Sequence, residues 1–522
     1  MITYKSVMCA LPVAFVIYFY PALANESTKQ LQENTSQSEH KPAQTTKPSK
    51  KASKNPPAQK ISLHYQINEQ PISTAETTED KPFAILSEIF NKTIETANQI
   101  PNQIVNTTVH IPYPEDMQKS FKEKLPNFVL QTTVETPHDK TKTNFNIAPF
   151  SGEITEHNKK GMLEWAGLNG LVNYIGTLKN LNGNVAIPRF FLKIENEFDI
   201  LMEKFSLTAG LNEYYEPLHF NLALPTIKIA SYEKDDAFTF NLSNLKATFV
   251  SDDQEILEGL RLGNVLFGID EIAFHNNKDS VVMKGISGEK AMQINDLTTK
   301  KFVNVSSKFN LNNLTLPPSF ANGLTNISFE VQTSLNNLDA QVLADIKKTL
   351  RQVQIQEFSL EMIGVMLMGD LMKALPKVIK GSPELDIHHF AIKTNQGELI
   401  GSFSVGIDGK KPFSMEKIEV LKMAIKAHSS IKISKNILRK ILVLTLKESK
   451  QQPSNEEGKI DGEKTKKKQT TQSIKPEKMV DEQIKQFIAQ KFLIEEAKHY
   501  KLDAEFEGGK LFLNNQEIPL PF

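Results

Sequence analysis

The chain has 522 residues, of which 39% are hydrophobic, and its 61 Lys and Arg residues balance its 61 Asp and Glu residues. This length allows a sizeable buried core in two or three domains, and the zero formal charge argues against a dominant nucleic-acid-binding surface. The single cysteine, Cys9, lies in the N-terminal apolar run. If that run is cleaved off, disulfides, thiolate catalysis and cysteine metal sites are all excluded.

Residues 1–24 have the pattern of a secretory signal peptide. Lys5 precedes an apolar run from Val7 to Ala24, which ends in the small-residue motif Ala22-Leu23-Ala24. The run is also close to the shortest length that crosses a bilayer, so an uncleaved N-terminal anchor is the alternative. We therefore expect an exported, periplasmic protein that is either soluble or tethered to the inner membrane through this segment.

Residues 25–60 are rich in Ser, Thr, Gln, Lys and Pro and contain hardly any apolar residue. This composition predicts a disordered linker. Residues 61–143 are predicted to form a helical N-terminal region, because apolar residues from Phe83 to Ile94 recur at helical spacing before Pro101.

Residues 144–446 are predicted to form a β-rich body. Runs such as Phe238, Phe240 and Leu242 alternate with polar residues, and short polar links separate them. This pattern predicts an α+β fold, with a large mostly antiparallel β-sheet and amphipathic helices packed on one face. The apolar side of the sheet is expected either to be covered by these helices or to line an open apolar groove.

A helix–hairpin unit over residues 335–407 is expected to be the centre of this body. Leu338 to Leu350 have the spacing of an amphipathic helix, and Phe358 to Ile379 form a helix whose apolar middle predicts burial on all sides. Pro376 is expected to kink or end this second helix. A hairpin from Glu384 to Ile407 follows, with its turn at residues 395–398.

The C-terminal part is predicted to contain two helices, over Met415–Ile425 and Ile433–Leu446. Residues 447–478 are polar and of mixed charge, which predicts a disordered insertion. Residues 479–522 are expected to form a C-terminal helix plus a β-hairpin with a Gly508-Gly509 turn, which completes the body.

Three stretches are similar to a known family. They are Ala374 to Pro383 together with Asn395 to Glu398, Leu421 to Ile433, and Leu502 to Asn515. In these stretches the chain resembles the YdgA-like family of bacterial envelope proteins, which have a domain of unknown function. The resemblance implies a periplasmic, β-rich body near the inner membrane, with a strand within residues 421–433 where the spacing alone favours a helix. It implies no catalytic residues.

The sequence contains no nucleophile elbow, zinc-protease motif, phosphate-binding loop or dinucleotide fingerprint. His388 and His389 are neighbours on a predicted strand, so we expect their side chains on opposite faces, unable to share one metal. We predict no catalytic residue, no metal site and no cofactor. The candidate site for a hydrophobic ligand or partner comprises Met362, Met366, Met368, Met372 and Phe403, and its alternative is an ordinary core.

Two functional hypotheses follow from these observations. The first is a non-enzymatic cell-envelope protein that acts as a scaffold or interaction component near the inner membrane, with an envelope protein as partner. The alternative is a lipid or hydrophobic-ligand binding and transfer protein, which uses an apolar sheet face and the Met-rich helix. A hydrolase with scattered catalytic residues is a third reading, and the sequence leaves the oligomeric state open.

Overall fold

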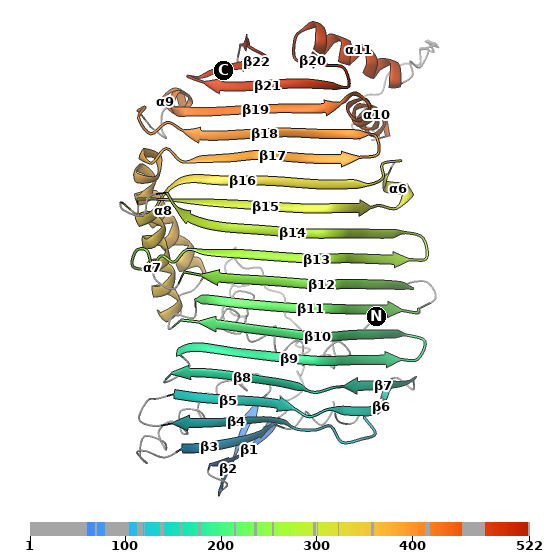
Figure 1. The fold of residues 1–522 in the computed structure, drawn as a ribbon, viewed down its shortest axis with the longest axis vertical. Coiled ribbons are helices and arrows are strands. Elements are labelled where there is room, and N and C mark those ends of the chain that lie inside the picture. Colours follow the sequence, from blue (N-terminus) through green and yellow to red (C-terminus); the bar gives the residue numbers. More distant parts are fainter. Residues whose placement is uncertain are drawn as a thin grey trace, which may run out of the picture. The chain divides into compact units, whose positions relative to one another are not determined.

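The computed structural model describes residues 60–67, 70–78, 104–111, 118, 121–135, 140–156, 159–175, 179–212, 216–233, 237–252, 255–295, 299, 301–321, 323–356, 360–412, 418–451 and 476–519 (Figure 1). The chain divides into two compact units. Unit 1 contains residues 1–253 and 346–370, and unit 2 contains residues 254–345 and 371–522.

Unit 1 is built from antiparallel strands. They are β1 (Lys60–Ile67), β2 (Gln70–Thr78), β3 (Ile104–Ile111), β4 (Phe128–Glu135), β5 (Lys140–Ile147), β6 (Phe150–Glu156), β7 (Lys159–Trp165), β8 (Leu168–Ile175), β9 (Lys179–Ile194), β10 (Phe198–Leu211), β11 (Pro217–Ser231) and β12 (Phe238–Ser251). The order across the sheet is β2, β1, β3, β4, β5, β8, β9, β10, β11 and β12. The first part of β9 pairs with β8 and its last part pairs with β7, which also pairs with β6.

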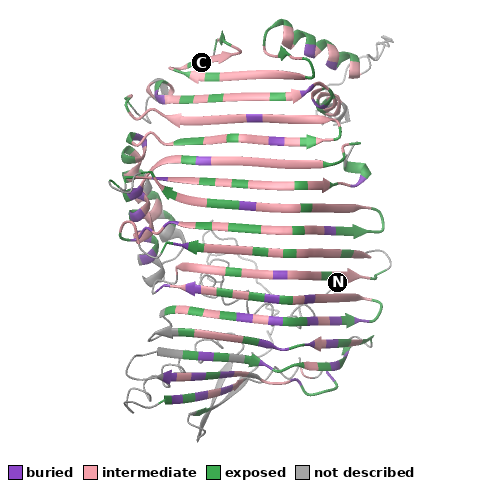
Figure 2. Ribbon diagram, in the orientation of Figure 1, coloured by how far each residue is buried: buried purple, intermediate pink, exposed green. Residues whose placement is uncertain are grey.

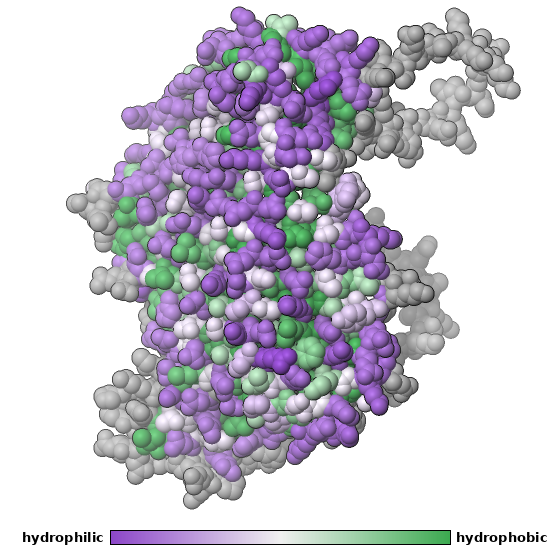
Figure 3. All heavy atoms as spheres, turned by 45° about the vertical axis from the view of Figure 1, so that its right-hand side comes forward, coloured by the Kyte–Doolittle hydropathy of each residue, from purple (hydrophilic) through white to green (hydrophobic). Residues whose placement is uncertain are grey.

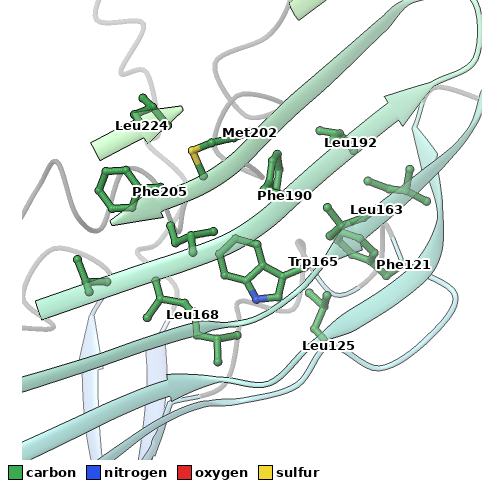
Figure 4. Close-up of a cluster of buried hydrophobic side chains, with 14 of the residues drawn as sticks. Phe121, Leu125, Leu163, Trp165, Leu168, Phe190, Leu192, Met202, Phe205 and Leu224 are labelled. Atoms are coloured by element: carbon green, nitrogen blue, oxygen red, sulfur yellow. The ribbon is translucent and has the colours of Figure 1, made fainter. Parts of the chain in front are cut away.

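The core of unit 1 is one buried cluster, to which strands β3 to β11 and the segment with Phe121 and Leu125 contribute. Trp165 and Phe190 meet edge to face with their ring centroids 5.8 Å apart, in the middle of the buried cluster (Figure 4). Leu168 and Ile187 are almost fully buried. Burial of such large side chains on one side of the sheet supplies much of the stability of this unit.

A buried ion pair holds the second half of helix α7 (Ala340–Gln356) within unit 1. Glu216, which precedes β11, accepts two hydrogen bonds from Arg351, at 3.0 Å from Nε and 2.7 Å from a terminal nitrogen. Lys347 and Asn212 donate further hydrogen bonds to the same carboxylate. Burial alone would raise the pKa of Glu216, but these hydrogen bonds outweigh it and lower the pKa from 4.5 to about 2.

Unit 2 is also an antiparallel sheet. Its strands are β13 (Gly263–Asn276), β14 (Ser280–Ile294), β15 (Phe302–Thr315), β16 (Ile327–Asp339), β17 (Glu384–Thr394), β18 (Gly397–Ile407), β19 (Ile425–Ser434), β20 (Ile494–Glu495), β21 (His499–Glu507), β22 (Lys510–Leu513) and β23 (Gln516–Ile518). They pair in chain order from β13 to β19, followed by β21, β22 and β23, and β20 pairs with β21.

The remaining helices are α6 (Pro318–Ala321), α8 (Leu360–Lys380), α9 (Ile418–Ala424), α10 (Lys435–Gln451) and α11 (Pro476–Ala489). Helix α11 begins with Pro476 at its first position, where a missing amide hydrogen costs nothing. It packs against α10 and buries Val480 and Ile484. The two helices therefore satisfy their apolar stripes largely against each other.

The predicted α+β class is wrong. Helix makes up only 19% of the structure, so the fold is dominated by strands. In unit 2, α6, α9 and α10 lie beside the ends of the strands and form no layer over the sheet (Figure 1). Helix α6 has 4 residues and α9 has 7, which is too short to cross a face whose strands are up to 15 residues long, whereas α10, with 17 residues, lies at the strand ends and packs against α11.

Several local predictions also need correction. Region 61–143, predicted to be helical, contains strands β1 to β4. The helix predicted near residues 83–94 lies outside the described residues. Residues 1–59 and 452–475 also lie outside them. Helix α8 continues through Pro376 to Lys380. Residues 425–434 form strand β19, which pairs with β18 and β21; the strand that the family resemblance implies within residues 421–433 therefore begins only at Ile425, and the predicted helix before it corresponds to α9.

Candidate functional site

One side of the sheet in unit 2 is apolar across its strands, and we call it the apolar face. The strand registers bring together Phe309 and Val331, Val331 and Phe390, and Ile387 and Phe403. The apolar face consists of Val265, Phe267, Ile269, Val282, Ile286, Val305, Phe309, Leu311, Phe329, Val331, Leu335, Leu385, Ile387, Phe390, Ile392, Leu399, Phe403, Val405, Ile425, Ala427, Ile431, Ile433, Leu502, Ala504 and Phe506.

Aromatic rings run across this face. The ring centroid of Phe309 lies 6.3 Å from that of Phe267 and 5.8 Å from that of Phe329. Gly288 of β14 is the cross-strand partner of Phe267, and any side chain there would overlap its ring. Gly401 of β18 has the same relation to Phe390. The two glycines let the aromatic rings lie flat over the neighbouring strand, which smooths the surface.

The apolar face is not buried by the described residues. From β16 to β21, each of its apolar side chains is half-buried or exposed, and Leu385 keeps 41% of its surface (Figure 2). The buried cluster of unit 2 is small and comprises Leu260, Leu262, Val303, Ala340 and Ala344. Hydrophobic side chains reach the molecular surface in patches among hydrophilic ones (Figure 3). Unit 1 differs, because its sheet carries an extensive buried cluster.

The opposite side of the same strands is polar. Lys308 forms an ion pair with Glu330, and a hydrogen bond from Gln332 lowers the pKa of Glu330 below its usual range. Asp503 accepts hydrogen bonds from Ser430 at 2.7 Å and Lys501 at 2.6 Å. Burial alone would raise the pKa of Asp503, but these two donors lower it. This side is suited to water, so the two sides of the sheet differ sharply in polarity.

The structure places the predicted site residues in different environments. Phe403 is half-buried on the apolar face, while Met368 and Met372 on α8 keep 60% and 55% of their surface. Met366 is half-buried, and the side chain of Met362 lies outside the described part. Met366 and Met368 belong to unit 1 and Met372 to unit 2. The expectation that α8 is buried on all sides is therefore wrong, and ligand binding by these five residues stays a prediction.

Sequence reasoning missed how the histidines lie. A β-bulge between Ile387 and Phe390 interrupts the alternation of β17. His388 contacts Ser334 and Asp386, and His389 lies 3.9 Å from Glu330. Both histidines therefore meet side chains of the polar side, and the prediction that they face opposite ways is wrong. Only cross-strand pairing reveals such a bulge, since no residue type marks it.

A polar cavity of about 630 Å³ lies beside the turn between β17 and β18. Of its charged lining residues, Lys435 is paired with Glu495 at 2.6 Å and His499 lies 3.6 Å from Glu398. Lys393 and Lys498 also line the cavity, so its charged lining residues are three lysines, Glu398 and His499.

Metal-binding clusters and membrane-spanning helices are both absent from the described residues. Within these ranges, His, Cys, Asp and Glu nowhere gather in a group of three or more that could hold a metal ion. The helices in the same ranges include none with the length and apolarity needed to cross a membrane.

Comparison with known proteins finds one family. Residues 97–521 match a family described as a bacterial protein of unknown function (DUF945). No match was found among curated proteins or among solved structures. The match includes all strands of unit 2 and agrees with the expected bacterial domain of unknown function, whereas the YdgA-like resemblance stays a prediction.

Proposed function

The chain belongs to the DUF945 family of bacterial proteins of unknown function, and we propose from its exposed apolar face that it binds the acyl chains of lipids. The single observation that carries this proposal is the extent of the apolar face, which crosses from β13 to β21 without cover from the described helices. Only a few polar residues, namely Lys290, Ser307, Thr333 and Ser429, lie among its apolar side chains. Soluble proteins rarely leave apolar surface of this extent in water, and such patches mark binding sites.

The dimensions of the apolar face fit an acyl chain. From β13 to β21 the face crosses seven strand-to-strand pairings of about 4.8 Å each, or roughly 34 Å. Along β18, Val405 to Leu399 span roughly 20 Å at about 3.4 Å per residue. The outline of the face, polar positions included, is therefore roughly 700 Å², which leaves room for an apolar patch of the size that marks binding sites. The hydrocarbon core of a bilayer is about 30 Å thick and two acyl chains deep, so one acyl chain is about 15 Å long. A chain of this length fits within both dimensions of the face.

The chemistry of the face favours a lipid over a smaller polar ligand. Its centre around Phe390 and Phe403 offers aromatic and branched aliphatic groups, so binding there would depend on apolar area. Export through residues 1–24, proposed from the sequence, would place the chain in the cell envelope, where lipids are abundant. In the scaffold hypothesis the same face would bind an envelope protein. The experiment below distinguishes this hypothesis from lipid binding.

The test is binding of a fluorescent long-chain fatty acid to the full-length protein purified without detergent, together with native mass spectrometry for copurified lipid. Phe403→Asn removes an aromatic ring from the apolar face, and Ser402→Asn introduces the same side chain beside it on the polar side. Burying half of a phenylalanine contributes about 1 kcal/mol, and an unpaired amide costs about as much again. We expect Phe403→Asn to weaken binding at least about tenfold and Ser402→Asn to leave it unchanged.

Two outcomes would contradict the lipid proposal. One is a protein that carries no lipid and binds no fatty acid, and the other is an equal loss of binding in both variants. If a photo-crosslinker at position 403 instead captured a defined envelope protein, the scaffold hypothesis would replace it. Circular dichroism of each variant checks that the strands are intact.

A further inference from the structure

Three side chains on the polar side of unit 2 form a chain of hydrogen bonds. Ser334 of β16 lies with its Oγ 2.8 Å from Nε2 of His388 on β17. Nδ1 of the same imidazole lies 2.9 Å from a carboxylate oxygen of Asp386. Because a carboxylate only accepts hydrogen bonds, Nδ1 of the neutral ring carries the proton and Nε2 accepts the hydrogen bond of the serine hydroxyl.

The local backbone brings these side chains together. Ser334 and Asp386 are direct cross-strand partners, so their side chains point to the same side of the sheet. His388 lies two residues after Asp386 and therefore on the same side, and the bulge after Ile387 brings His389 to this side as well. Asn336, two residues after Ser334 and so on the same side, donates a hydrogen bond from Nδ2 to the serine Oγ at 2.9 Å.

The arrangement has the connectivity of a nucleophile, a base and an orienting acid. Ser334 keeps 7% of its surface, whereas the His388 side chain is half exposed, so the imidazole is open to solvent on its outer side. The Asn336 amide next to the hydroxyl is of the kind that stabilises negative charge developing on a carbonyl oxygen. The imidazole of His388 lies 2.8 Å from the Ser334 hydroxyl and 2.9 Å from the Asp386 carboxylate, so it joins these two groups across adjacent strands.

We propose that Ser334 is the nucleophile of a hydrolase for carboxylic esters, with His388 as general base and Asp386 as the positioning residue. The Ser334 hydroxyl adds to the ester carbonyl while its proton passes to Nε2 of His388, and the imidazolium then protonates the departing alcohol. Water attacks the resulting acyl-serine and gives its proton to His388. The products are the carboxylic acid and the free Ser334, so one ester and one water become one acid and one alcohol.

The polar side of the sheet defines the substrate class. Ser402, Ser404 and His428 continue this side on β18 and β19, and they offer no apolar pocket for a long chain. The substrate is therefore a water-soluble ester of a short acyl group, reached from solvent. This activity is independent of acyl-chain binding, because the apolar face lies on the other side of the same strands.

The test uses the full-length protein, p-nitrophenyl acetate as substrate and a fluorophosphonate probe that forms a covalent adduct with activated serines. We expect the probe to label Ser334, as located by mass spectrometry of peptides. Ser334→Ala and His388→Asn should each lower kcat/KM by about 100-fold or more. His389→Asn, a change at the neighbouring histidine, and Ser306→Ala, a change at the serine paired with Ser334 on β15, should leave kcat/KM unchanged.

Asp386→Asn should lower kcat with little change in KM, because it acts through the orientation of His388 and not on substrate binding. Circular dichroism separates loss of activity from loss of fold for each variant. The proposal is overturned if the natural sequence hydrolyses the ester no faster than buffer and takes up no probe. It is also overturned if activity or labelling persists in Ser334→Ala. Fatty-acid binding is read separately, so either proposal can fail without the other.

Discussion

The ion pair between Glu216 and Arg351 makes the attachment of α7 in unit 1 sensitive to acid. Both side chains are nearly buried, with 11% and 10% of their surface exposed. A pKa lowered from 4.5 in the unfolded chain to about 2 corresponds to about 3 kcal/mol of stabilisation at neutral pH. Because the folded pKa is the lower one, this stabilisation is complete above about pH 5 and is lost as the pH falls toward 2.

The perturbation is Glu216→Gln, which removes the charge and leaves Arg351 buried without its carboxylate partner. Hydrogen–deuterium exchange of residues 346–351, corrected for the intrinsic effect of pH, reports the opening of this part of α7. We expect protection in the natural sequence to fall by about 30-fold between pH 6 and pH 3, and the variant to be poorly protected at both.

Glu203→Gln is the matched control, because Glu203 pairs with Arg189 at 4.0 Å and both side chains are exposed. An exposed pair contributes about 0–1 kcal/mol, so this variant should behave like the natural sequence. The reasoning is refuted if residues 346–351 stay protected in the natural sequence at pH 3, or if Glu216→Gln retains the same dependence on pH.

Two further variants test the packing. Phe190→Ala should destabilise unit 1 by about 3–5 kcal/mol, because the buried ring of Phe190 packs on Trp165. Denaturant unfolding, followed by the fluorescence of this single tryptophan, measures the change, and the exposed Lys193→Ala is the control. Equal unfolding midpoints for the two variants would contradict the prediction. Gly397→Ala should destabilise the β17–β18 hairpin by about 1–3 kcal/mol, because φ is 134° there and an added methyl would overlap Ser434. Gly364→Ala on α8 is the control, because a methyl group added there meets no other atom. If hydrogen exchange of the hairpin is the same in the two variants, the turn tolerates the methyl group.

Local periodicity predicted many of the strands, and helices α8, α9 and α10 lie close to their predicted ranges. The alternation of Leu399, Phe403 and Val405 identified β18 and its apolar side, since each side chain in a strand points to the side opposite its neighbour. The helices predicted over Met415–Ile425 and Ile433–Leu446 match α9 and α10, whereas strand β19 between them was implied only by the family resemblance and is defined by its pairing with β18 and β21. Helical spacing cannot reveal such pairing, because the partners are distant in the chain.

By itself the sequence determined which side of each strand is apolar and that the strands are antiparallel, because alternation and short polar links are local properties. Whether the apolar side is covered depended on where the helices lie, and α6, α9 and α10 lie at the strand ends of unit 2. The contact of Ser334 with His388 and Asp386 also required the tertiary structure. It depends on the register of β16 against β17, which pairs Ser334 with Asp386 and which pairing between distant segments decides.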